Sequence, residues 1–225
     1  MSGGASQFSA RACPARDCPL CPRLAAFRAD QRARHPDWFN APVPPFGGAD
    51  ARLLIVGLAP GLQGANRTGR PFTGDYAGEL LYATLAEFGF ARGTYAARAD
   101  DGLRLQDAAI VNAVRCVPPQ NKPLPSEMAA CRPFLGAALA EAPRVRAIVA
   151  LGRVAHENVV RASGARLSVH PFAHGARHDL ACDDRRVALF DSYHCSRYNT
   201  NTRVLTPDMF RAVFASARAA LDREA

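Results

Sequence analysis

Four short and almost uninterrupted runs of apolar residues are the clearest pattern along this chain. Each run is too short for the apolar stripe of a helix, and it lacks the alternation of a strand with one wet face. Such runs are typical of strands buried on both faces of a parallel sheet. They cover Leu53 to Val56, Ala108 to Val114, Ala147 to Leu151 and Val187 to Phe190.

Between these runs the apolar residues recur with a helical period. The pattern predicts a first helix from near Pro22 to about Arg34, and then helices at Tyr76 to Phe90, Ser126 to Leu139, Val154 to Ala162 and Pro207 to Leu221. Ser126 and Thr206 suit N-cap positions, and Pro207 suits a first turn. Strands that alternate with helices predict a three-layer α/β/α sandwich around a central, mainly parallel four-stranded sheet.

The length of the chain bounds its organisation. With 225 residues and 48% hydrophobic content, we expect a single domain over residues 17–225, preceded by a frayed segment at 1–16 that is small and polar. No run approaches the roughly 18 apolar residues of a membrane helix, and the first residues lack the apolar core of a secretory signal. We therefore expect a monomer in the cytosol with no membrane partner.

Candidate chemistry gathers where parallel strands end, because active residues belong at the carboxyl ends of such strands. Gly57 and His194 both fall there, and a glycine-rich loop follows Gly57. A nucleotide-binding P-loop would need Gly-Lys-Ser/Thr at the next helix start, which this loop lacks. Within the loop, Asp75 also suits a helix N-cap and Phe72 also suits a core position.

The chain has seven cysteines, and their spacing separates candidate metal ligands from the others. Cys18 and Cys21 form a C-x-x-C pair, while Cys116 and Cys131 supply a second, wider pair. Four soft ligands suit zinc or an iron-sulfur cluster, and the spacing alone leaves the metal open. The second pair also fits two ordinary buried thiols. We take the remaining cysteines as non-ligands: Cys13, Cys182 and Cys195.

The formal charge of +8 comes mainly from arginine, whose planar fork matches phosphate oxygens. A basic chain of this kind favours a polyanionic partner such as DNA. Charge alone is a weak indication, because many basic proteins never bind nucleic acid.

Taken in order, the motifs resemble the uracil-DNA glycosylase superfamily, and within it family 5, the B-type iron-sulfur enzymes. The resemblance runs from about Cys18 to Phe214 and rests on the cysteines together with four stretches of sequence. These are Gly57-Leu58-Ala59-Pro60-Gly61 through Gly69-Arg70-Pro71-Phe72-Thr73-Gly74-Asp75, Val114 through Pro123, His170-Pro171-Phe172-Ala173-His174-Gly175, and Ser192-Tyr193-His194-Cys195-Ser196-Arg197-Tyr198-Asn199-Thr200. The resemblance implies a DNA repair enzyme that flips uracil and other deaminated or modified bases out of DNA and hydrolyses the N-glycosidic bond.

The resemblance also implies a role for each site residue. Asp75, His194 and Asn121 would be catalytic, with Asp75 directing water and stabilising the sugar while His194 donates to the departing base. The base pocket would use Gly57, Leu58, Ala59, Gly61, Phe72 and Asn112. DNA would contact Arg197, Tyr198 and Asn199, with Tyr198 as a wedge in the base stack. A [4Fe-4S] cluster would take Cys18, Cys21, Cys116 and Cys131 as its ligands.

Two positions set this chain apart from better-known members of the superfamily. Those members carry Asp and Tyr where this chain has Ala59 and Gly61, so the carboxylate must come from elsewhere, and Asp75 matches the residue given that role in family 5. Glycine at 61 leaves room where a tyrosine would exclude thymine. We therefore expect several bases to be accepted, including hypoxanthine and 5-substituted uracils.

Other interpretations stay open from the sequence. A non-catalytic iron-sulfur protein that binds damaged DNA would keep the fold without turnover, and a family 4 enzyme would carry Glu in place of Ala59. A thiol hydrolase built on Cys195 is disfavoured, because residues adjacent on a strand point to opposite faces. His170, His174 and His178 have the spacing of a helical metal triplet, but Pro171 and Gly175 favour a loop near DNA.

Overall fold

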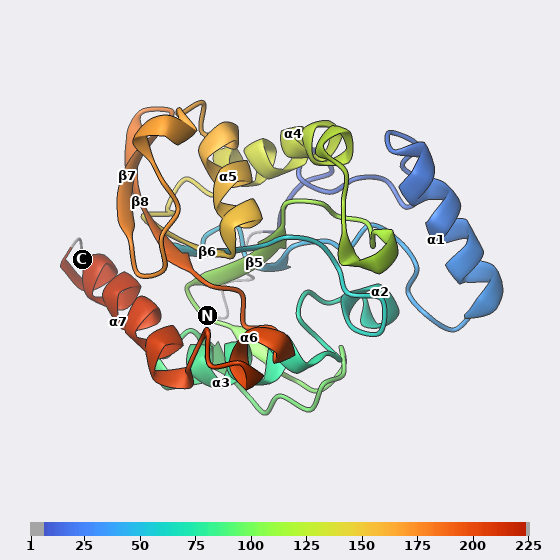
Figure 1. Cartoon of the computed structure of the whole chain (residues 1–225), viewed down its shortest axis with the longest axis horizontal. Helices are drawn as coiled ribbons and strands as arrows, with labels where there is room; N and C mark the ends of the chain where they lie inside the picture. Colours follow the sequence, from blue (N-terminus) through green and yellow to red (C-terminus); the bar gives the residue numbers. More distant parts are fainter. Residues whose placement is uncertain (1–6, 224–225) are drawn as a thin grey trace, which may run out of the picture.

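In the computed structural model, which describes residues 7–223, one mixed sheet lies between two layers of helices (Figure 1). The sheet has six strands in the order β1-β5-β2-β6-β8-β7. Their bounds are β1 Phe46–Gly47, β2 Leu53–Gly57, β5 Ala108–Asn112, β6 Ala147–Leu151, β7 Arg177–Cys182 and β8 Arg185–Ser192. A separate hairpin pairs β3 Ala91–Arg92 with β4 Arg104–Leu105.

The four predicted strands form the parallel centre of this sheet, but the prediction of four strands in all is wrong. Strands β5, β2, β6 and β8 run parallel, and an antiparallel strand is added at each edge. β1 lies in a Pro- and Gly-rich stretch for which the sequence predicted no strand. β7 mixes exposed and buried positions, so it has no continuous apolar run to reveal it.

The helices cover both faces of the sheet, as predicted for an α/β/α sandwich. Alternate residues of the central strands point to opposite faces. On one face Leu53 and Ile110 pack with α3 Tyr76–Glu87 and α7 Pro207–Arg223. On the other face Leu54 and Val111 pack with α4 Pro125–Glu141 and α5 Arg153–Ala162. Figure 1 shows α1 Pro22–Arg34 at one end of the molecule, beside α4.

The helix ends mostly follow the sequence signals. Thr206 caps α7, since its hydroxyl accepts from the amide of Met209 at 3.2 Å. The prediction of Ser126 as an N-cap is wrong, because α4 begins at Pro125 and its N-cap is Leu124. There the Glu127 carboxylate accepts from the Leu124 amide at 2.7 Å, which is the half of a capping box that the N3 residue supplies. Short helices complete the chain: α2 Ala65–Thr68, α6 Arg197–Asn201 and two 3₁₀ turns at Pro119–Asn121 and Leu167–Val169.

The segment expected to be frayed at 1–16 lies partly outside the described residues, at 1–6. Its remainder contacts the molecule: the Ser9 amide donates to the Glu141 carboxylate at 2.7 Å, and Ala12 is fully buried. Among the described residues, no helix is long and apolar enough to cross a membrane.

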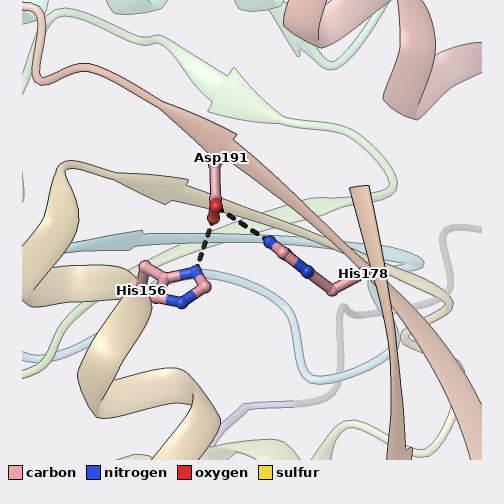
Figure 2. Close-up of side chains that lie close together, drawn as sticks. All are labelled: His156, His178 and Asp191. Atoms are coloured by element: carbon pink, nitrogen blue, oxygen red, sulfur yellow. Dashed lines mark hydrogen bonds and ion pairs between the residues drawn. The ribbon is translucent and has the colours of Figure 1, made fainter. Parts of the chain in front are cut away.

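A buried polar network fixes the end of β8, the strand that leads to His194. Asp191 is fully buried on β8, and Figure 2 shows His156 of α5 and His178 of β7 pointing at its carboxylate. The ring nitrogens lie close to the two carboxylate oxygens, with His156 Nδ1 at 2.7 Å and His178 Nε2 at 3.1 Å. The network therefore joins three elements just before the chain reaches His194.

The hydrogen bonds of His156 reveal its charge. Its second ring nitrogen, Nε2, lies 2.9 Å from the carbonyl oxygen of His170, so both ring nitrogens face acceptors, an arrangement that favours the doubly protonated ring. The hydrogen bond to Asp191 and its negative charge outweigh the larger opposing effect of burial and raise the pKa of His156. Two histidines and an aspartate are also a donor set for metals, but here protons already satisfy the contacts of His156.

We predict that His156→Leu lowers the free energy of unfolding by about 3 kcal/mol at pH 6, because it leaves the Asp191 carboxylate buried without its cation. The raised pKa of His156 gives the sign of the pH dependence. Its stabilisation is complete below the ordinary pKa of 6.5 and is lost as the pH rises through the folded-state value. Denaturant unfolding at several pH values should therefore show the variant approaching the wild type above neutral pH.

The exposed Glu157–Arg161 pair on the same helix offers a matched control. Glu157→Gln should change the free energy of unfolding by no more than about 0.5 kcal/mol. A deficit in His156→Leu that stays constant between pH 6 and pH 9 would contradict the charged assignment.

Candidate active site

A cavity of about 370 Å³ opens where β2 and β5 end. Most of the residues predicted to act on the base line this one cavity: Leu58, Ala59, Gly61, Phe72, Asp75, Asn112, Asn121, His194 and Arg197. Gly57, Tyr198 and Asn199 do not line it. A hollow of this size is typical of a site for a small ligand or a single extruded group.

Asp75 lies on one side of the cavity at the start of α3. It is the N-cap of that helix, and its carboxylate accepts from the amide of Gly78 at 3.3 Å, so the capping interpretation from the sequence is correct. Burial raises the pKa of the Asp75 carboxyl above the ordinary 3.8, against the lowering effect of backbone amides. Capping fixes the side chain while its second oxygen lies near the glycine-rich loop.

Glycines in that loop make room for the carboxylate. A Cβ at Gly64 would lie 2.4 Å from Asp75 Oδ2, which is a clash, and one at Gly61 would lie 3.2 Å from the same atom. The loop therefore packs its backbone directly against the acid, which explains why glycine is needed at 64.

Phe72 and Asn112 form the floor beside Gly57. A Cβ on Gly57 would lie 2.7 Å from the Phe72 ring and 2.4 Å from Asn112 Oδ1, so Gly57 acts by letting both side chains approach. Phe72 is buried and has a φ of 52°, a left-handed conformation that is costly for a side chain of this size. The Oδ1 atom of Asn112 is buried without a hydrogen-bond partner, so this amide can bond a group placed in the cavity.

His194 faces the same cavity from the turn after β8. Its ring lies 6.0 Å from that of Phe72, centroid to centroid, with 29° between the planes. Burial lowers the pKa of His194 to about 4, so the imidazole is neutral at physiological pH and keeps one N–H to donate. The side-chain amide of Asn199 donates to the His194 carbonyl at 2.8 Å, which holds the turn.

The outer rim of the cavity carries the remaining predicted residues. Asn121 is exposed, with a φ of 57° at the end of a 3₁₀ turn. Arg197 begins α6, and its guanidinium lies 5.2 Å from the centroid of the Tyr76 ring. Tyr198 follows it and is 73% exposed. An exposed aromatic side chain therefore follows the basic residue that lines the cavity.

The cysteines predicted as ligands line a second, smaller cavity: Cys18, Cys21, Cys116 and Cys131. Cys21 is the N-cap of α1, and Cys131 lies on α4. Among the described residues, no three of these sulfur atoms lie within 4.8 Å of one another. Cys182 and Cys195 lie elsewhere, in the two main cores on opposite faces of the sheet, and Cys195 donates to the Ala77 carbonyl at 3.5 Å.

Two buried arginines lie beside these cysteines. Arg28 donates to the sulfur of Cys116 at 3.1 Å, and the backbone amide of Arg115 donates to the sulfur of Cys131 at 3.3 Å. Within residues 7–223 neither guanidinium forms an ion pair, and Arg28 Nε, Arg115 Nε and Arg115 Nη1 are buried without partners. Burying two such cations is costly without nearby negative charge.

The three histidines at 170, 174 and 178 do not form a helical triplet. Residues 170–176 form a loop after a 3₁₀ turn, and His178 lies on β7. His174 Nδ1 accepts from the amide of Tyr193 at 3.1 Å, and its ring stacks on the Tyr193 ring. The loop thus braces the residue that precedes His194.

Sequence reasoning missed part of the wall of the active-site cavity: Ala65, Tyr76, Ala77 and Ser196 also line it. Tyr76 and Ala77 follow Asp75 in the first turn of α3, so a helix start at Tyr76 implied their position. Ser196 caps α6, since its hydroxyl accepts from the Asn199 amide at 3.3 Å. The motif around His194 therefore contained a cap signal as well as the candidate donor.

Comparison with known proteins places this geometry in a family. Residues 44–218 match the model of the uracil DNA glycosylase superfamily. The chain is 46% identical over 207 residues to the type-5 uracil-DNA glycosylase of Thermus thermophilus, covering 89% of this chain and 92% of that protein. It is 39% identical over 227 residues to the type-5 enzyme of Mycobacterium bovis, covering 97% and 83%, and 38% identical to that of Pyrobaculum aerophilum, covering 90% and 88%. The chain therefore belongs to the uracil DNA glycosylase superfamily and groups with its type-5 members.

Proposed function

We propose that this protein is a DNA glycosylase that flips uracil and other damaged bases out of DNA and hydrolyses the N-glycosidic bond, leaving an abasic site for repair. The observation that carries the proposal is one cavity lined by both a half-buried carboxylate, Asp75, and a neutral imidazole, His194. The names of the type-5 relatives support the same activity. The basic charge of the chain suits a DNA substrate.

The two groups match the charges that develop during the reaction. Breaking the N-glycosidic bond builds positive charge on the sugar and negative charge on the departing base. The Asp75 carboxylate, partly removed from water, attracts the sugar cation more strongly than an exposed acid would, and it can orient the attacking water. His194 donates its N–H to the base oxygen. Because the ring is neutral, it stabilises that oxygen without first giving up a proton to solvent.

The other lining residues bind and orient the base. Phe72 offers its ring as a platform for the extruded base, and the unpartnered Oδ1 of Asn112 accepts from an N–H on the edge of the base. Asn121 contacts the base or its water from the rim, while the Leu58 region supplies backbone amides. Arg197 binds phosphate, and the exposed Tyr198 wedges into the base stack.

We also propose that the four cysteines hold a [4Fe-4S] cluster. Two features support a thiolate-bound metal centre, and the resemblance to family 5 favours an iron-sulfur cluster over zinc. The four residues line one cavity, and two buried arginines without an ion pair suit the net negative charge of four metal-bound thiolates. When bound, the cluster ties the loop before α1 to α4 and the segment after β5.

Base release tests the catalytic assignment. Asp75→Ala and His194→Ala should each lower the single-turnover rate of uracil release from duplex DNA by about a hundredfold or more, because each removes one charge-matched contact to the transition state. Their DNA affinity should stay close to that of the wild type. Exposed Asp179→Ala on β7 provides the control and should cleave normally.

Wild-type rates in both variants would remove these two residues from the mechanism. DNA binding by the wild type without any release of base would instead indicate a non-catalytic protein that binds damaged DNA.

Metal analysis tests the cluster. Cys18→Ser and Cys116→Ser should each reduce the iron and sulfide bound per chain and the broad visible absorbance, since each removes a ligand. Arg28→Met should make the cluster more easily lost in air, because the Cys116 sulfur loses its hydrogen bond. Cys13→Ser, at a cysteine outside the cavity, should retain full iron content. Zinc in place of iron, or retention of iron by the ligand variants, would contradict the assignment.

The breadth of the substrate range follows from Gly61. With no side chain there, the cavity has room for bases larger than uracil, so we expect release of hypoxanthine and 5-substituted uracils. Gly61→Tyr should abolish these activities before that on uracil. Rates measured on a panel of single-lesion duplexes check this, and activity of the wild type on uracil alone would contradict it.

A further inference from the structure

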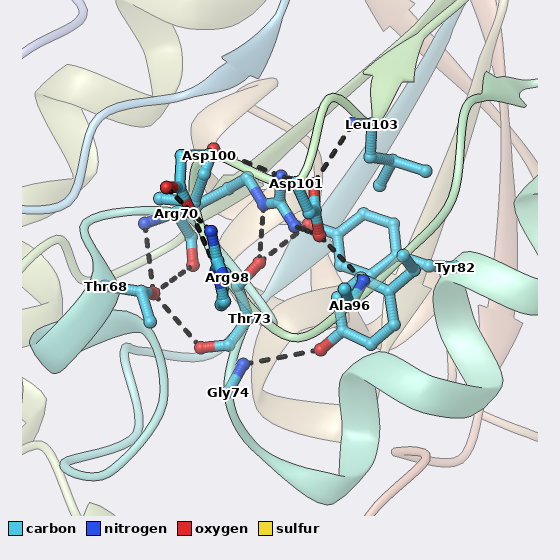
Figure 3. A network of polar contacts seen from close by, with 12 residues as sticks. Thr68, Arg70, Thr73, Gly74, Tyr82, Ala96, Arg98, Asp100, Asp101 and Leu103 are labelled. Atoms are coloured by element: carbon cyan, nitrogen blue, oxygen red, sulfur yellow. Dashed lines mark hydrogen bonds and ion pairs between the residues drawn. The ribbon is translucent and has the colours of Figure 1, made fainter.

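A buried arginine, Arg70, joins Thr73, in the turn before Asp75, to Asp101, as Figure 3 shows. The guanidinium of Arg70 forms two hydrogen bonds of 2.7 Å to the two carboxylate oxygens of Asp101. The side chains are only 5% and 1% exposed. Asp101 belongs to a distant loop, whose amides at Ala96 and Leu103 donate to the same carboxylate at 2.9 and 3.0 Å. The arginine therefore has a partner that is itself fixed.

The same guanidinium reaches into the turn. Its Nε donates to Thr73 Oγ1 at 2.7 Å, and its carbon lies 5.1 to 5.9 Å from the ring centroids of Phe46, Tyr82 and Tyr95. Arginine is suited to this position, because its planar fork bonds a carboxylate and stacks on aromatic faces at once. A lysine could not make both sets of contacts.

Two tyrosines of this network hold the backbone on either side of Phe72. Tyr82 donates to the Pro71 carbonyl at 2.6 Å. Tyr95 donates to the Phe72 carbonyl at 3.2 Å and accepts from the Gly74 amide at 3.3 Å. The backbone groups that these two tyrosine hydroxyls contact thus all lie between Pro71 and Gly74, just before Asp75.

The turn needs such support because its conformation is costly. Phe72 and Gly74 have φ values of 52° and 89°, and a left-handed phenylalanine costs of order 1–3 kcal/mol unless its surroundings enforce it. If the support were lost, the Phe72 backbone would relax toward negative φ. Its ring would leave the floor of the cavity, and the Asp75 cap, three residues later, would shift with it.

We infer that Arg70 and Asp101 are positioning residues for base release, which act by holding the turn from Phe72 to Asp75 in the geometry of the transition state. Neither side chain lines the cavity, so neither touches the base. The inference rests on the proposed glycosylase activity and adds to it a loop, residues 96–103, that the sequence motifs do not include.

The neighbouring acid Asp100 provides a matched control. Asp100 pairs with Arg98 in the same loop, but those side chains are 75% and 70% exposed and lie at the surface. Asp101→Asn should lower kcat for uracil release by between tenfold and a hundredfold, about the loss expected when reacting groups are displaced by a fraction of an ångström to an ångström. KM should change by less than about threefold. Asp100→Asn should leave kcat and KM unchanged.

A second measurement separates positioning from simple loss of stability. In the Asp75→Ala background, Asp101→Asn should cause a much smaller further loss of kcat, because the group that it positions is already gone. Tyr95→Phe is a milder variant that keeps the ring and removes the hydroxyl, and it should lower kcat several-fold even if Asp101→Asn folds poorly.

The outcomes are distinct. If the wild type and Asp100→Asn release uracil while Asp101→Asn and Tyr95→Phe match them in kcat, the positioning role is overturned, even where their melting temperatures fall. If the Asp101→Asn loss is undiminished in the Asp75→Ala background, it does not act through the carboxylate. If neither the wild type nor Asp100→Asn releases any base, the proposed function fails and this inference fails with it.

Discussion

The parallel pairing of β2, β5, β6 and β8 is the constraint on which the site depends, because it brings their carboxyl ends to one edge of the sheet. The glycine-rich loop leaves from β2, and the turn with His194 leaves from β8. Residues more than a hundred positions apart in the chain therefore face one cavity. The antiparallel edge strands cap the sheet and contribute nothing directly to the cavity wall.

Burial tunes the two central groups in opposite directions, and both changes suit the proposed chemistry. Loss of water raises the pKa of Asp75 and lowers that of His194 to about 4, since burial disfavours whichever form is charged. At neutral pH the imidazole is therefore uncharged. A carboxylate at Asp75 and a neutral donor at His194 are the complement of a cationic sugar and an anionic base. Glycines at 57 and 64 permit this arrangement by letting side chains approach the backbone closely.

The sequence predicted the centre of the fold well and its margins poorly. Continuous apolar runs identified all four parallel strands, but β7 was missed because its mixed exposure leaves no such run. In the site, the motifs identified Asp75, Phe72 and His194, which line one cavity. The sequence could not identify Asp101 as a residue that supports the site. It lies about thirty residues from its partner Arg70, in a loop without hydrophobic periodicity. The side-chain amide of Asn199 bonds the His194 carbonyl, a contact that only the folded turn reveals.

A crystal structure of the Asp75→Asn variant bound to a duplex with a single uracil tests the central claim most directly. The account predicts the uracil outside the stack and against the Phe72 ring. The residue at 75 should lie on the sugar side, His194 should lie within hydrogen-bond distance of a base oxygen, and Tyr198 should fill the vacated space. A uracil bound away from this cavity, or an extruded base with position 75 and His194 on the same side of the glycosidic bond, would contradict it.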